Sequence, residues 1–208
     1  MTVVIAAGVK PIIGKSQLAE ERVRKVAEIY DHHGGKVRVA RVSMGMYAGN
    51  MLLQTATPDF TTATSVMSAA MNDDAYHQVM QEREENPGAE MMGPFMFRTI
   101  YGDIAWDTHP VSQMRIYQIS RKNVPAAVSI LGEVDALTED IKVVGVAPVV
   151  SEDMTIIHAT YQFKSISHWG EQIDKVGMSE EFQELVNKAN DLGTLVSSGV
   201  YMLSLIHI

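Results

Sequence analysis

The spacing of hydrophobic residues in the first half of the chain predicts strands and helices in the order β-α-β-β-α-β. Apolar or alternating runs predict strands at residues 2–9, 36–46, 51–57 and 95–101. Apolar residues recur at helical spacing between residues 18 and 30, and again between 60 and 83. The second helical region is interrupted at Asn72-Asp73, which predicts two shorter helices.

The same order of elements is predicted a second time. Strands are expected at 114–121, 142–150, 154–164 and 194–203, with a helix at 124–137 and a helical region broken near 177–179. Adding 106 to positions 36–97 gives 142–203 without a gap, so that Lys36-Val37 falls on Lys142-Val143 and Tyr76 on Phe182. A fixed offset between matching hydrophobic positions indicates an internal duplication.

Each predicted unit has the order of the ferredoxin-like split βαβ motif. Its helices cover one face of an antiparallel sheet, so the other face is apolar and must be covered as well. We therefore expect an α+β fold in which two ferredoxin-like repeats, residues 1–104 and 111–208, pair their sheets into one pseudo-dimeric barrel. Residues 105–110 lie in a polar linker between them, where Trp106 is expected to dock onto the fold.

One stretch of the second repeat resembles a known family. It is the run Tyr161-Gln162-Phe163-Lys164-Ser165-Ile166-Ser167-His168-Trp169, followed by Phe182-Gln183-Glu184-Leu185. In this pattern the chain resembles the dimeric α+β barrel superfamily, in its fused two-repeat form and particularly its NIPSNAP-like branch. The superfamily includes cofactor-free monooxygenases, small-molecule cyclases and isomerases, haem-binding enzymes and proteins without known activity. The resemblance implies a ligand pocket between the sheet and the helices of one repeat.

Charge and composition narrow the function classes. A net charge of −8 at pH 7 argues against binding to nucleic acid or to anionic membranes. The chain has no cysteine, which excludes disulfides, thiolate metal sites and cysteine catalysis, and no spacing of histidines predicts a metal site. No targeting segment is recognisable, so a soluble, cytoplasmic protein is expected. Association of fused barrels into a homo-oligomer is left open.

The strongest candidate for chemistry is His158 on the predicted strand 154–164. Alternation places it on one face with Ile156, Thr160 and Gln162, whereas Tyr161 lies on the other face. A histidine in an interior strand could act as a general base, or it could simply satisfy a hydrogen bond. It aligns with Leu52, and Trp169 aligns with Ala63, so the second half is where an active pocket is expected. The predicted ligand-binding residues are His158, Tyr161, Tyr117, Arg115 and Trp169.

Arginines on predicted strands form a second group of interest: Arg38, Arg41, Arg98 and Arg115. An unpaired guanidinium would be costly in a sheet, so they either pair with acids, which we favour, or bind an anionic ligand. The resemblance also implies that a histidine of the second repeat, His158 or His168, could ligate haem; otherwise no cofactor is expected.

The sequence favours a small-molecule-binding protein or a cofactor-independent enzyme that acts on an apolar or aromatic compound. Fourteen methionines fit either an irregular core or a flexible apolar pocket. The alternatives are a non-catalytic structural or interaction protein and a haem protein, and whether the chain is an enzyme stays open. The apolar end of the chain, residues 203–208, indicates either a last strand that reaches the terminus or a truncated reading frame.

Overall fold

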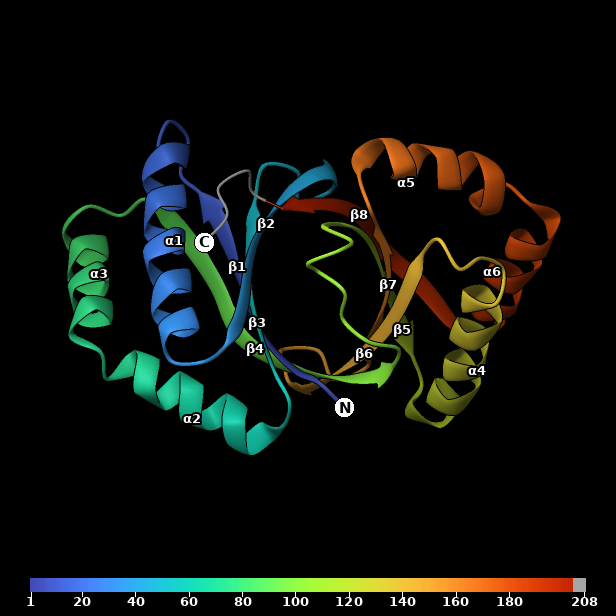
Figure 1. The fold of residues 1–208 in the computed structure, drawn as a ribbon, viewed down its shortest axis with the longest axis horizontal. Coiled ribbons are helices and arrows are strands. Elements are labelled where there is room, and N and C mark those ends of the chain that lie inside the picture. The colour runs from blue at the N-terminus through green and yellow to red at the C-terminus, as the bar shows by residue number, and fades with distance from the viewer. Residues whose placement is uncertain (204–208) are drawn as a thin grey trace.

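A computed structural model describes residues 1–203 and has eight strands and six α-helices within them (Figure 1). In the first half the elements are β1 (Val3–Pro11), α1 (Ser16–His32), β2 (Lys36–Gly45), β3 (Met51–Thr57), α2 (Phe60–Met71), α3 (Asp74–Glu85) and β4 (Ala89–Tyr101). In the second half they are β5 (Val111–Ile119), α4 (Val124–Asp135), β6 (Lys142–Val150), β7 (Ile156–Phe163), α5 (Ile166–Gln172), α6 (Glu180–Leu192) and β8 (Gly193–Leu203). A π-helical turn, Ile173–Gly177, follows α5.

The predicted order of elements is confirmed, and most boundaries differ by only a few residues. The largest difference is β4, which begins at Ala89 rather than at residue 95. The strand starts earlier because β1 continues to Pro11, which pairs with Ala89 beyond a register shift. The two alternatives for the end of the chain, a strand that reaches the terminus or a truncated reading frame, concern residues 204–208, which lie outside the described residues.

All eight strands are antiparallel neighbours in one sheet, in the order β1-β3-β2-β8-β5-β7-β6-β4, and β4 pairs with β1 to close a barrel (Figure 1). The predicted α+β class is therefore confirmed. Each half contributes four adjacent strands, and the halves meet twice, where β2 pairs with β8 and where β4 pairs with β6. As expected from the split topology, β7 lies beside β5 in the interior of the second half.

The helices lie on the outside of the barrel, with α1–α3 against the first half and α4–α6 against the second (Figure 1). Their apolar faces pack on the outer face of the sheet, for example Val66 on Val3 and Leu185 on Tyr117. The breaks predicted in both second helical regions are confirmed. Asp73 caps α3 and Ser179 caps α6 through side-chain acceptance of a backbone N–H.

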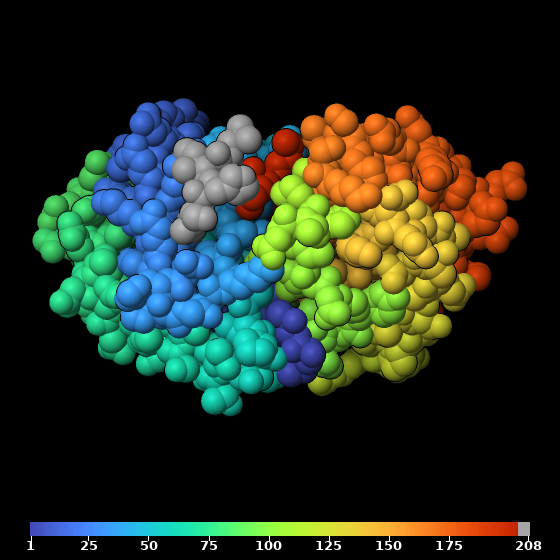
Figure 2. Space-filling model, viewed as in Figure 1, coloured from blue at the N-terminus to red at the C-terminus, as the bar shows by residue number. Residues whose placement is uncertain are grey.

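The strand side chains that point away from the helices line the inner face of the barrel. The connecting segment, residues 102–110, lines it as well. Trp106 of this segment is only 5% exposed and packs on Val4, Ala6 and Phe97. The backbone N–H of Ala105 donates to Oε1 of Gln162 at 2.9 Å. The connecting segment thus crosses one end of the barrel, which Figure 2 shows as a covered face. The predicted docking of Trp106 is confirmed.

No helix within residues 1–203 is both long and apolar enough to span a membrane.

Candidate functional site

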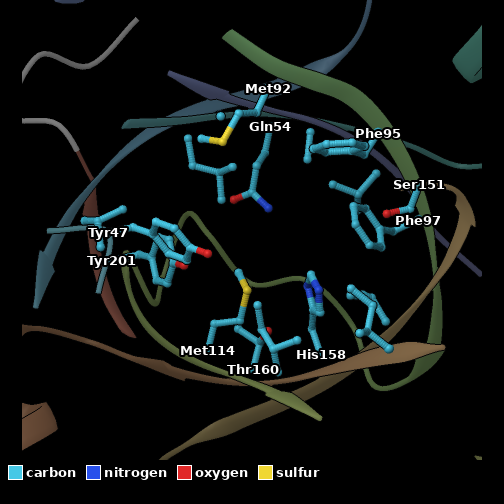
Figure 3. A pocket seen from close by; sticks show the side chains of 18 of the residues that line it. Tyr47, Gln54, Met92, Phe95, Phe97, Met114, Ser151, His158, Thr160 and Tyr201 are labelled. Carbon is cyan, nitrogen blue, oxygen red and sulfur yellow. The ribbon is translucent and has the colours of Figure 1, made fainter. Parts of the chain in front are cut away.

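A cavity of about 300 Å³ lies inside the barrel, between the connecting segment and the two hairpins β2–β3 and β6–β7 (Figure 3). Its walls come from both halves of the chain and are mostly apolar. The apolar lining includes Leu52, Phe95, Phe97, Met114, Ile116 and Val146. A mostly apolar, concave space with a few polar groups is typical of a small-molecule site.

Arg38, on β2, contributes a buried cation to the cavity wall. It is 4% exposed, and burial lowers the pKa of its guanidinium to about 9, so the group is charged at neutral pH. Nε donates to Oε1 of Gln54 at 2.7 Å, and Nη1 donates to Oγ of Ser112 at 3.2 Å. The guanidinium carbon lies 4.4 Å from the ring centroid of Trp106.

His158, on β7, projects into the cavity from the wall that faces Gln54 (Figure 3). Its ring lies 4.9 Å from the ring of Phe97, centroid to centroid. Burial lowers the pKa of the imidazole to about 4, so it is neutral at pH 7. Its Nε2 is buried and has no hydrogen-bond partner in the described structure. A buried polar atom without a partner is unusual and needs an explanation.

Tyr201 and Tyr47 approach the cavity from one side, with their hydroxyl oxygens directed towards its centre (Figure 3). Tyr201 comes from β8 and is buried, and burial raises the pKa of its hydroxyl. Tyr47 comes from the β2–β3 hairpin and is partly exposed. Tyr201 is therefore a neutral hydrogen-bond donor at neutral pH, and Tyr47 adds a second hydroxyl to the same side of the cavity.

Polar side chains also line the hairpin end of the cavity. Asn50 lies on the β2–β3 hairpin, and Ser151, Glu152 and Asp153 follow β6 on the other hairpin. Lys36, at the start of β2, and Gln162, near the end of β7, both contact the connecting segment. The two hairpins are at the other ends of these strands and are therefore remote from that segment. We refer to this end as the mouth of the cavity.

A second cavity, of about 140 Å³, lies between the outer face of the first-half sheet and the helices α1 and α3. The corresponding space in the second half is divided into two cavities of about 40 and 20 Å³. The resemblance implied a pocket between sheet and helices, and the second half was the expected location. The larger space of that kind is in the first half, because Phe182, Leu185 and Tyr161 fill the second.

The five predicted ligand-binding residues do not lie together. His158 lines the barrel cavity, whereas Tyr117 and Tyr161 belong to the core under α4 and α6 on the outer face. The guanidinium of Arg115 lies over the rings of Tyr161 and Phe182, at 5.8 and 5.4 Å from their centroids. On α5, Trp169 donates from Nε1 to Oε1 of Gln113 at 3.0 Å. Four of the five therefore lie outside the barrel.

The strand arginines differ in their surroundings. Arg41 pairs with Glu20, as we favoured. For Arg38 that preference is wrong: among residues 1–203 no carboxylate forms an ion pair with it. Its neighbours are instead an amide, a hydroxyl and an indole ring. Gln54, Tyr201 and Trp106 were not predicted as site residues, because nothing in their spacing distinguishes them from core positions.

The histidines proposed as haem ligands do not fit that role. Nδ1 of His168 accepts a hydrogen bond from the backbone N–H of Lys164 at 3.1 Å, and the nearby outer-face cavities are too small for a macrocycle. Nε2 of His158 is covered beside Phe97. No group of three or more acidic or histidine side chains within residues 1–203 could hold a metal ion.

A comparison with protein-family models finds no match, and a comparison with curated protein sequences finds none either. Solved structures do match. A putative monooxygenase from Fusobacterium nucleatum subsp. nucleatum superposes with a TM-score of 0.66 at 7% identity, over 97% of this chain and 92% of that one. An anthrone oxidase-like protein gives a TM-score of 0.64 at 12% identity, over 99% and 91%.

The heme-degrading enzyme LmHde from Listeria monocytogenes superposes with a TM-score of 0.53 at 9% identity, over 97% of this chain and 99% of that one. Identities this low establish a shared fold and leave function open. The chain thus has the ferredoxin-like α+β fold that these proteins share.

Proposed function

We propose that this protein binds an apolar, mainly aromatic small molecule inside the barrel. The observation that carries the proposal is the cavity of about 300 Å³ inside the barrel, whose largely apolar wall contains the unpartnered His158 and the buried Arg38. Ligand pockets combine such an apolar lining with a few polar groups that fix orientation. A purely structural protein would gain stability from filling this space, because empty volume forfeits packing contacts.

The binding test uses naphthalene-2-carboxamide, a neutral bicyclic aromatic, and isothermal titration calorimetry. We expect saturable binding to the wild type and at least about tenfold weaker binding to Ile116→Trp, because the larger side chain occupies the cavity. Val196→Trp is the matched control, since Val196 is 48% exposed and does not line the cavity. Equal binding to the two variants would contradict the proposal, as would failure of the wild type to bind both this amide and the corresponding carboxylate.

Cofactor-independent catalysis is the extension of this proposal, supported by a neutral imidazole and a cation in one cavity. His158 would accept a proton from a C–H or O–H group of the ligand, and Arg38 would stabilise the resulting anion. For oxidation of an anthrone-type CH₂ to a carbonyl, O₂ supplies one oxygen atom to the product and the other leaves as water. The electrons come from the substrate, so no external reductant is needed.

Oxygen uptake in the presence of anthrone tests the catalytic extension. We expect uptake by the wild type and a loss of at least about tenfold in His158→Ala. If the wild type binds the carboxamide but leaves anthrone unchanged, the non-catalytic alternative is favoured and the binding proposal is unaffected.

We also propose that the two halves, residues 1–104 and 111–208, derive from one ferredoxin-like unit and form a pseudo-dimeric barrel of the NIPSNAP-like type. Two helix caps support this, because Asp59 and Ser165 lie 106 positions apart and both cap the helix after the third strand of their half. The pairing of β2 with β8 and of β6 with β4 is reciprocal, as in a two-fold interface. Halves expressed as residues 1–110 and 111–208 are expected to reassemble when mixed.

A further inference from the structure

Among residues 1–203, Arg38 is the one buried lysine or arginine, and no acidic side chain forms an ion pair with it. Arg24 and Arg41 pair with Glu20, and Lys25 pairs with Glu82, all towards the outside of the molecule. Arg38 is 4% exposed and lines the barrel cavity, where the groups around it are neutral. Burial of a charge without a counter-charge is expensive, so a cation kept in this position points to a partner that comes from outside the chain.

The hydrogen bonds of Arg38 leave part of the guanidinium available. Gln54 and Ser112 use Nε and Nη1, and among residues 1–203 no hydrogen bond uses Nη2. Arg38 and Gln54 are direct cross-strand partners on β2 and β3, so the bond between them is fixed by the register of the sheet. A planar guanidinium with unused N–H donors is suited to binding a carboxylate or another anionic oxygen.

Gln54 extends this donor set. Its Oε1 accepts the hydrogen bond from Arg38, so its amide nitrogen must point elsewhere, and Figure 3 shows this nitrogen directed into the cavity. The hydroxyl of Tyr201 is a further donor on the cavity wall and is close enough to Arg38 for the two groups to influence each other's pKa. Donors from β2, β3 and β8 therefore face one region of the cavity.

The negative side chains of the cavity lie at its other end. Glu152 and Asp153 are the carboxylates among the lining residues, and they belong to the β6–β7 hairpin at the mouth. Arg38 is at the inner end, because it lies against Trp106 of the connecting segment. This distribution of charge favours a ligand whose negative group lies at the inner end and whose neutral part lies at the mouth. A negative group at the mouth would be repelled by the two carboxylates there.

We propose that the barrel cavity selects aromatic compounds carrying one anionic oxygen group, a carboxylate or an ionised hydroxyl, which Arg38 and Gln54 bind at the inner end. The inference rests on the binding function proposed above and specifies its ligand class. The apolar wall, including Phe95, Phe97 and Met114, accommodates the ring system. The ligand thereby supplies the counter-charge that the chain itself does not provide.

The test compares two probes of the same shape, naphthalene-2-carboxylate and naphthalene-2-carboxamide, by isothermal titration calorimetry at pH 7. We expect the wild type to bind the carboxylate at least about tenfold more tightly than the amide, as charge-assisted hydrogen bonds predict. Arg38→Met, which keeps most of the volume, is expected to weaken carboxylate binding by about 10- to 100-fold and to change amide binding by about twofold or less. Arg38→Lys is expected to restore part of the preference.

The matched control is Arg98→Met, because Arg98 is an exposed arginine on β4 outside the cavity lining, and both probes should bind it as they bind the wild type. Thermal unfolding verifies that each variant is folded, and amide binding verifies that its cavity is intact. Equal binding of the two probes to the wild type, or an undiminished preference in a folded Arg38→Met, would overturn the anion inference alone. Failure of the wild type to bind either probe would overturn this inference together with the binding function.

Discussion

The guanidinium of Arg38 lies 4.4 Å from the ring centroid of Trp106, so the connecting segment and strand β2 share a cation–π contact at the inner end of the barrel. This contact joins the segment between the two halves to the cavity wall. The bond from Ala105 to Gln162 attaches the same segment to β7. Trp106 is consequently a fixed part of the cavity floor, and its environment should respond to what the cavity contains.

Fluorescence of Trp106 should report ligand binding. The chain has two tryptophans, so Trp169→Phe leaves Trp106 as the only one. We expect naphthalene-2-carboxylate to change the emission of this variant, because the ligand would lie beside Arg38 and the indole. Trp106→Phe, which retains Trp169 on the outer face, is expected to show little change. A full response that persists in Trp106→Phe would place the binding site elsewhere.

His158 should make the stability of the protein depend on pH. Its pKa is about 4 in the folded protein and near 6.5 when unfolded, so between these values the unfolded chain binds more protons. The stabilisation is complete above pH 6.5 and is lost as the pH falls towards 4, by up to about 3 kcal/mol. Urea unfolding between pH 7 and 4.5 should therefore show a steeper loss for the wild type than for His158→Leu.

The control for this experiment is His77→Leu, which makes the same substitution at an exposed histidine of α3 and keeps His158, so the steep loss should persist in it. His109 is buried as well, and its lowered pKa contributes in all three proteins, so the difference between variants isolates His158. Parallel profiles for wild type and His158→Leu would show that the imidazole titrates normally.

Gly102 should be intolerant of a side chain because it begins the connecting segment in a left-handed conformation, with φ of +64°. A Cβ atom there would lie 2.0 Å from the carbonyl oxygen of Val143. Gly49, with φ of +91° and no atom within 4 Å of such a Cβ, is the matched control. We expect Gly49→Ala to destabilise the fold by about 1–2 kcal/mol and Gly102→Ala to destabilise it by more. Similar unfolding midpoints for the two variants would contradict this.

Haemin is expected to remain unbound, because Nδ1 of His168 already accepts a hydrogen bond and Nε2 of His158 is buried beside Phe97. Incubation of the protein with haemin should therefore give no new visible absorption band beyond that of free haemin. A band that appears with the wild type and is lost in His158→Ala would reverse this conclusion and identify the ligand.

Local periodicity was sufficient to predict the elements of the fold. Alternation along β7 placed His158 with Thr160 and Gln162, and these three residues do line the same cavity. It could not show which face is inside, because both faces of the strand are covered and apolar. The register between β5 and β7 pairs Arg115 with Ala159 and Tyr117 with Ile157, which assigns these residues to the outer face.

The composition of the candidate site depended on contacts between distant segments. Arg38 was recognised as a strand arginine that needed a partner, but its bonds to Gln54 and Ser112 follow from strand register and from the meeting of the two halves. Trp106 was expected to dock, yet its position over Arg38 depends on the path of a segment without periodicity. Sequence patterns predict which side chains share one face of a helix or strand. They do not predict which faces of distant elements come together to form the cavity.

The joining of both halves in a single chain has a consequence at position 38. The residue 106 positions further on is Val144, which lines the same cavity. Two identical subunits arranged around this space would each contribute an arginine, and two buried cations would repel one another across it. A single continuous chain can place a cation on one side and an aliphatic residue on the other. The interior is therefore asymmetric, and a ligand inside it has one preferred orientation.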